Sequence, residues 1–208
     1  MLTRKELFSI AVVSLVLGLV ISLVGSISLL LTTTFFVFIV IIVNTLAKKV
    51  FGFFLDIDIE VKIWEIKQFW VKKHMHFKNS VQAGIFIPLI VKFVTVGLVN
   101  WMTCLTFDAS GKVYRAARRH GIYSFSEVSE EEIGWIAAAG IIATLIFAAI
   151  FYIIGQGTLT RISIIYAFFN MIPAFDWDGA KIFFGSMTLW SFLAIITLIA
   201  LAATFVIV

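Results

Sequence analysis

Long apolar segments alternate with short polar ones along most of the chain. Six windows are each close to the length of about 20 residues that an α-helix needs to cross a hydrocarbon core of about 30 Å. They lie near residues 7–24, 28–47, 81–106, 134–155, 159–175 and 182–208. This pattern predicts a polytopic membrane protein built mainly from α-helices.

Two polar stretches interrupt the apolar windows. In residues 56–63, aliphatic residues alternate with charged ones, and this period of two predicts a half-buried or edge β-strand outside the bilayer. We therefore place a small β element at 56–66. The second polar stretch, residues 107–133, contains the predicted turn DASGK at 108–112, then a basic cluster and an acidic run.

Composition agrees with a membrane protein and excludes several other classes. Of the 208 residues, 62% are hydrophobic and 13% are charged, and the mean hydropathy is +1.09, more apolar surface than a soluble domain of this size could bury. The single cysteine, Cys104, excludes an internal disulfide and cysteine metal clusters. The net charge of +4 reflects basic loops at a membrane surface, so no nucleic-acid partner is expected. The N-terminus lacks a clear signal-peptide cleavage site, which predicts a retained first helix.

The string NMIPAFDWDGAKIFFG, residues 170–185, is the most specific in the sequence. It allows a purely structural interpretation, in which Pro173 ends a helix, Gly179 permits a turn, and Asp176 and Asp178 lie in interfacial water. Carboxylates next to membrane helices are also candidates for a functional site.

This string resembles a motif of a known protease family. Asn170, Pro173, Asp178 and Gly179 are spaced as in the N-x-x-P-x-x-x-x-D-G motif of the site-2 protease family of intramembrane zinc metalloproteases, in its archaeal form. In that family the aspartate is the third zinc ligand, and two histidines of an H-E-x-x-H motif on an earlier helix are the others. The resemblance covers roughly residues 5–185.

The stretch that corresponds to H-E-x-x-H departs from the family pattern. Residues 44–49 read Asn-Thr-Leu-Ala-Lys-Lys where archaeal members carry a string such as H-E-L-A-H-K, so Leu46 and Ala47 fit. Asn44 and Lys48 replace the two histidine ligands, and Thr45 replaces the glutamate.

A third segment supports the alignment in part. Ala137, Ala139 and Gly140 match the family pattern A-x-A-G-P-x-x-N, whereas Ile141 and Thr144 replace its proline and asparagine.

These replacements remove the chemistry of a zinc protease. Asn44 is a poor zinc ligand, the ammonium of Lys48 repels a metal cation, and Thr45 has no carboxylate to act as general base. Asp178 would be a vestigial ligand, and no catalytic position is intact. The resemblance would place Lys48 beside Asp178, so we predict an ion pair that takes over the role of zinc in tying the helices together. The alternative is that Lys48 extends to the lipid headgroups.

The same juxtaposition constrains the topology. Basic residues at the start of the chain and at Lys48 and Lys49 place the N-terminus and the end of the second window on the cytoplasmic side. Residues 50–133 form an insert between the second window and the later helices. Asp178 can lie on the cytoplasmic side only if this insert begins and ends on the cytoplasmic side. The window 81–106 is then a re-entrant segment or a membrane-dipping strand hairpin.

The predicted fold is an all-α polytopic membrane protein, a single domain over residues 1–208. It has about five membrane-spanning helices, the dipping segment, the small β element and an outside C-terminus. In this orientation Arg161 is the only Lys or Arg outside, with Lys92 in the dipping segment.

Three functions are compatible with these features. The first is a pseudoprotease that binds or scaffolds membrane helices, with the lipid bilayer and a transmembrane client or membrane-protein partner as its partners and no cofactor. The second is an active zinc metalloprotease with atypical ligands, for which His74 and His76 are the candidates, whereas His120 lies elsewhere in a polar loop. The third is a small transporter or subunit of a membrane complex, with Lys92, Asp176 and Asp178 as intramembrane charges.

Overall fold

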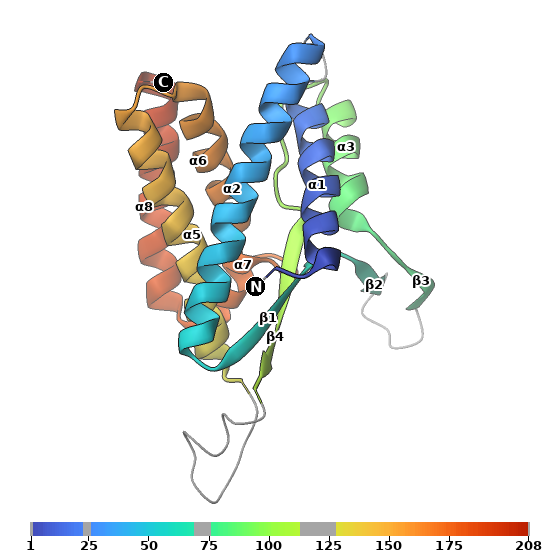
Figure 1. The fold of residues 1–208 in the computed structure, drawn as a ribbon, viewed down its shortest axis with the longest axis vertical. Coiled ribbons are helices and arrows are strands. Elements are labelled where there is room, and N and C mark those ends of the chain that lie inside the picture. The colour runs from blue at the N-terminus through green and yellow to red at the C-terminus, as the bar shows by residue number, and fades with distance from the viewer. Residues whose placement is uncertain (1, 23–25, 69–75, 113–127, 208) are drawn as a thin grey trace, which may run out of the picture.

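The computed structural model describes residues 2–22, 26–68, 76–112 and 128–207. Most of these residues are helical (Figure 1). The helices are α1 (Arg4–Ser22), α2 (Ile27–Phe54), α3 (Ala83–Val94), α5 (Glu130–Ile153), α6 (Gly157–Met171), α7 (Asp178–Gly185) and α8 (Met187–Ile207). The strands are β1 (Ile57–Ile63), β2 (Ile66–Gln68), β3 (His76–Val81) and β4 (Leu105–Gly111).

Four helices among the described residues, α1, α2, α5 and α8, are long and apolar enough to cross a membrane. This agrees with the membrane class predicted from the hydropathy pattern. The window at 159–175, predicted as a further span, forms the shorter helix α6 of 15 residues, about 22 Å long.

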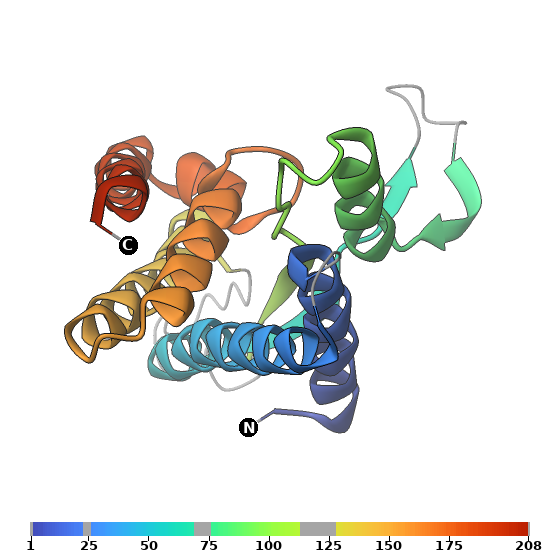
Figure 2. The ribbon, with the colours of Figure 1, turned by 90° about the horizontal axis from the view of Figure 1, so that it is seen from above.

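The helix α2 lies between α1 and α5. It packs against α1 on one side and against α5 on the other, as the view from above shows (Figure 2). The core between these helices consists of fully buried aliphatic residues such as Leu17, Val40, Ile41 and Ile136. This arrangement holds the polar end of α2 between α5 and the strands.

The helix α5 begins where the sequence changes from polar to apolar. Ser129 accepts a hydrogen bond from the backbone N–H of Glu132, and the Glu132 side chain bonds back to the Ser129 backbone, which completes a capping box. The acidic residues of the first turn also interact favourably with the helix dipole. Local sequence therefore fixes the start of this helix.

The alternating pattern at 56–63 forms a strand, as predicted. In β1, Ile57, Ile59 and Val61 are buried and the residues between them are exposed. β1 pairs with β4 in antiparallel register, from Ile57 opposite Gly111 to Ile63 opposite Leu105. A second small sheet joins β2 and β3.

The expectation of a turn at residues 108–112 is wrong for most of that stretch, because Asp108–Gly111 continue β4. The glycine and serine that suggested a turn are opposite Ile57 and Asp58 in the sheet. Cross-strand pairing, which is invisible in the local sequence, outweighs the turn propensity of these residues.

The window 81–106 does not form one membrane-spanning helix. It divides into the end of β3, the 12-residue helix α3, an irregular segment and the start of β4. The helix ends in a turn where Val96 and Gly97 both have positive φ, and Lys92 donates to Gly97 O at 2.9 Å and to Asn100 Oδ1 at 2.6 Å. The two forms expected for this window were a re-entrant segment and a strand hairpin. Residues 83–104 contain the short helix α3 and no strand hairpin.

The window 182–208, predicted as one helix, is also divided. It contains the second half of α7 and all of α8, which are separated at Ser186, a residue in the extended conformation. α7 crosses α5 closely, because a Cβ atom on Gly185 would lie only 2.7 Å from Glu130 O and 3.0 Å from the Cα of Gly134. Two glycines at the crossing bring α7 against α5, and α8 then turns back along the bundle.

Candidate functional site

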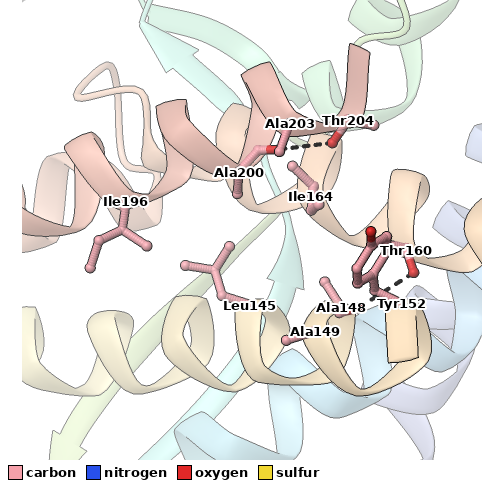
Figure 3. A pocket seen from close by; sticks show the side chains of 10 residues that line it. All are labelled: Leu145, Ala148, Ala149, Tyr152, Thr160, Ile164, Ile196, Ala200, Ala203 and Thr204. Atoms are coloured by element: carbon pink, nitrogen blue, oxygen red, sulfur yellow. Dashed lines mark hydrogen bonds between the residues drawn. The ribbon is translucent and has the colours of Figure 1, made fainter. Parts of the chain in front are cut away.

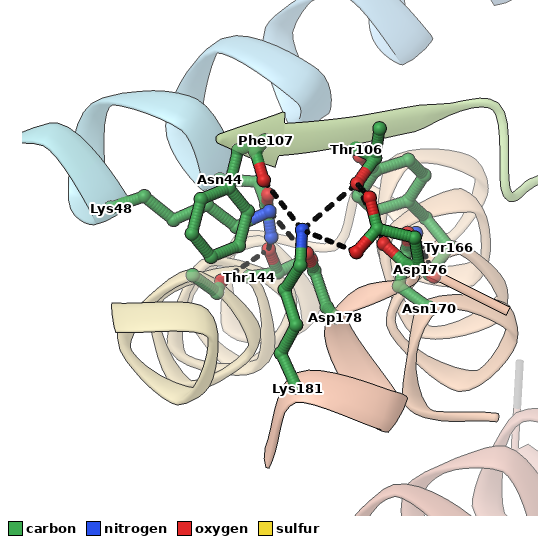
Figure 4. A network of polar contacts seen from close by, with 11 residues as sticks. Asn44, Lys48, Thr106, Phe107, Thr144, Tyr166, Asn170, Asp176, Asp178 and Lys181 are labelled. Carbon is green, nitrogen blue, oxygen red and sulfur yellow. Dashed lines mark hydrogen bonds and ion pairs between the residues drawn. The ribbon is translucent and has the colours of Figure 1, made fainter. Parts of the chain in front are cut away.

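A buried ion pair joins α2 to α7. Lys48 Nζ lies 2.6 Å from Asp178 Oδ2, and the two side chains are 8% and 1% exposed. The pair that the sequence predicts is therefore present in the structure (Figure 4). Lys48 points into the protein and not toward headgroups, so the alternative orientation does not occur. The residues are separated by 130 positions in the chain.

Asn44 lies one helical turn before Lys48 on the same face of α2. Its Nδ2 donates to Thr144 Oγ1 at 3.2 Å, and Thr144 in turn donates to Gly140 O at 2.8 Å. A Cβ atom on Gly140 would lie 2.6 Å from Lys48 Cε and 3.0 Å from Asn44 Nδ2. The glycine therefore leaves space on α5 for both side chains. Thr45, the third of the replaced positions, is also buried.

A second lysine lies beside the first pair and was not identified as a site residue from the sequence. Lys181 Nζ is 2.9 Å from Thr106 Oγ1, 2.5 Å from Phe107 O and 3.3 Å from Asp176 Oδ1. Thr106 also bonds to Asp176, through its Oγ1 and the carboxylate Oδ2 at 2.9 Å. The strand β4 brings Thr106 and Phe107 to this position, and no local motif marks them.

The ring of Phe107 lies close to both ammonium groups. The centroid is 5.1 Å from Lys48 Nζ and 4.1 Å from Lys181 Nζ, within the range of cation–π contacts. Burial lowers the pKa of Lys181, and the carboxylates of Asp176 and Asp178 oppose this effect. Two cations and two anions thus form one network with no net formal charge. This limits the cost of burying Lys48, Lys181 and Asp178, whereas the Asp176 side chain is more than half exposed.

The residues of the Asp-Gly motif have clear structural roles. Asn170 Nδ2 donates to Tyr166 O at 2.8 Å within α6, and Pro173 lies two residues after the last residue of α6. A Cβ atom on Gly179 would lie 2.3 Å from Met171 O, so only glycine lets the start of α7 approach the end of α6. The motif holds Asp178 at the first position of α7.

Aromatic side chains fix the connection between α6 and α7. The ring of Trp177 is 5.2 Å from that of Trp64 and 5.4 Å from that of Trp101, in edge-to-face arrangements. Phe175, which has a positive φ of 51°, packs on the same cluster at 5.1 Å from Trp177. The insert therefore anchors the loop that carries Asp176 and Asp178.

The donors of this site do not fit a zinc ion. Asn44 is hydrogen-bonded to Thr144, Lys48 is an ammonium in contact with Asp178, and catalytic zinc requires three good N, O or S ligands. In the described part of the chain, no group of three or more His, Cys, Asp or Glu side chains could hold a metal. His74 and His120 lie outside the described residues, and His76 begins β3 in the second sheet.

A separate groove lies between α5, α6 and α8, with a volume of about 320 Å³ (Figure 3). Its walls are apolar and include the small side chains of Ala148, Ala149, Ala200 and Ala203. We call it the alanine groove. It lies apart from the charged network, because none of the network residues lines it.

Comparisons with protein-family models, with curated proteins and with solved structures found no match to this chain.

Proposed function

We propose that this protein is a non-catalytic homologue of the site-2 proteases that binds or scaffolds membrane helices. The observation that carries the proposal is the ion pair between Lys48 and Asp178, at 2.6 Å and almost fully buried. It joins the two positions that the resemblance assigns to metal ligands. A cation on the protein itself would thus stand in place of the metal.

The remaining contacts support the same proposal. Asn44, Lys48 and Gly140, all at positions that the resemblance aligns with family motifs, contact one another across α2 and α5. Asp178 reaches them from α7. Relative to the family motifs, this arrangement lacks a general base and two ligands, and that difference supports a non-catalytic role.

The helix-binding part of the proposal concerns the alanine groove. Small residues let helix backbones approach closely within a membrane, and the groove combines four alanines with a nearly apolar wall. On the α8 side of the groove, the side chain of Ile196 is partly exposed. A partner helix packed there would bury part of this surface.

The metal-site prediction can be tested by restoring the replaced side chains. The triple variant Asn44→His, Thr45→Glu, Lys48→His should bind about one zinc per chain, whereas the unmodified protein should bind almost none. The expected gain arises because two imidazoles and the Asp178 carboxylate form the His₂Asp type of donor set that zinc accepts. Zinc content is measured by elemental analysis of protein purified without added metal and after equilibration with zinc.

The matched control carries the same three changes together with Asp178→Asn. It should lose most of the zinc, because the third ligand becomes a neutral amide. Stoichiometric zinc in the unmodified protein would refute the proposal. Equal zinc in the triple variant and its control would show that Asp178 does not share a ligand geometry with positions 44 and 48.

A further inference from the structure

A larger cavity lies along α6, starting from its first turn. It has a volume of about 560 Å³ and is bounded by α1, α6, α8 and the segment after α3. This volume falls within the range of about 300–1,000 Å³ typical of ligand sites. We call it the Arg161 cavity, after the one charged residue in its wall.

The cavity has a polar part and an apolar part. Asn100, Thr158 and Arg161 provide polar groups. Most of the remaining wall is hydrophobic and includes Ile21, Met102, Ile165, Phe168, Leu201 and Phe205. An amphipathic molecule would match both parts.

The polar groups form a set of donors. Asn100 Oδ1 already accepts from Lys92 at 2.6 Å, so the Nδ2 group is the one left to donate to a ligand. Arg161 is exposed and forms no ion pair with any residue in the described ranges. Thr158 lies in the first turn of α6, where the positive end of the helix dipole favours an anion. The cavity thus offers a cation and neutral donors, with no carboxylate in its wall.

We propose that the Arg161 cavity binds an anionic phospholipid, with the phosphate on the Arg161 guanidinium and one acyl chain along the apolar wall. Guanidinium is well suited to phosphate because it offers paired N–H donors in a plane.

This inference does not depend on the proposed pseudoprotease function. Arg161 precedes Asn170 by nine residues in α6, a distance of about 14 Å along the helix. None of the residues that line the cavity belongs to the Lys48 and Asp178 network. Either proposal can fail while the other holds.

The test compares lipid binding by the unmodified protein and by Arg161→Gln. Detergent-purified protein is titrated with phosphatidylglycerol or phosphatidylcholine, and bound lipid is counted by native mass spectrometry. The unmodified protein should bind phosphatidylglycerol about tenfold more tightly than phosphatidylcholine, because the choline ammonium of phosphatidylcholine offsets the phosphate charge that pairs with Arg161. Arg161→Gln should abolish this preference, and it should weaken the binding of phosphatidylglycerol far more than that of phosphatidylcholine.

Two controls make the result specific. Lys5→Gln removes an exposed cation in the first turn of α1 and should leave the preference intact. Ile165→Trp fills the apolar part and should weaken the binding of both lipids, with its fold checked by an unchanged elution volume. An unchanged preference in Arg161→Gln would overturn the proposal. Competition by inorganic phosphate at the same concentration as the lipid would show a simple anion site and would also overturn it.

Discussion

Position 48 shows how the surroundings of a single residue accommodate a buried charge. A lysine in an apolar segment costs about 2.5–3.5 kcal/mol at the centre of a bilayer on insertion scales. Here the ammonium is 2.6 Å from a carboxylate and 5.1 Å from the centroid of an aromatic ring, and Gly140 gives it room. One oxygen of the partner, Asp178 Oδ1, is buried without a hydrogen bond from the described residues. Asp178 thus depends on Lys48 for charge compensation.

Replacement of Lys48 by Met should destabilise the protein strongly. The change leaves the Asp178 carboxylate buried without its closest cation, and loss of one partner of a buried pair typically costs about 3–5 kcal/mol. The double variant Lys48→Met, Asp178→Asn should recover much of that loss, because no uncompensated charge remains. Thermal and denaturant unfolding in detergent measure both effects.

Lys62→Met provides the matched control, since Lys62 also forms an ion pair with an aspartate, Asp108, but both side chains are exposed. Its effect on the free energy of unfolding should stay below about 1 kcal/mol. The interpretation of Lys48 would be wrong if both single variants had equally small effects.

At the scale of elements, contacts between α1, α2 and β1 give Lys49 a structural role, although the sequence suggested only that it lies at the membrane interface. Lys49 was expected to mark the end of a membrane helix in water. Instead Lys49 Nζ is 2.7 Å from Glu6 Oε1, and Glu6 also accepts from the backbone N–H of Val61 at 3.0 Å. One buried carboxylate thus joins α1, α2 and β1.

The alanine groove is also a property of elements, because three helices form it. We expect a partner helix to pack in the groove between α5, α6 and α8. A photo-crosslinking residue at position 200, which lies inside the groove, should then yield discrete protein adducts in native membranes. The same residue at the neighbouring position 199 is the control, since Ile199 is 64% exposed and does not line the groove. Denaturing gels after irradiation measure the adducts. Identical adduct patterns at both positions, or none at 200, would count against the groove as a helix site.

At the scale of the whole molecule, the helices divide its polar groups between two ends. The end of α5, the start of α6 and the end of α8 lie at one end, whereas α7 and the β1–β4 sheet lie toward the other (Figure 1). The charged network belongs to the second group and the Arg161 cavity to the first. The two proposed functions are therefore assigned to opposite ends of the bundle.

This division predicts the accessibility of cysteines introduced after Cys104→Ala. Single cysteines at the exposed positions Ser26 and Gln156 should react with a membrane-impermeant maleimide from one side. Those at the exposed positions Asp108 and Glu131 should react only from the other side, which is the cytoplasmic side if the distribution of basic residues has been interpreted correctly. Labelling of intact and opened cells distinguishes the sides. Reaction of positions 108 and 156 from the same side would contradict this arrangement.

The sequence by itself determined the apolar helices, the strand at 57–63 and the position of the Asp-Gly motif. These depend on local composition and periodicity, which each segment carries on its own. It also predicted the pair of Lys48 and Asp178, through a resemblance between motifs.

Only the tertiary structure decided the division of 81–106 and 182–208, the pairing of β4 with β1, and the roles of Lys181, Phe107 and Glu6. Each depends on contacts between segments far apart in the chain, such as Phe107 with Lys181 or Gly185 with Gly134. Local propensity is weak compared with the packing energy of such contacts. For that reason the neighbours of a buried charge could not be identified before the fold was known.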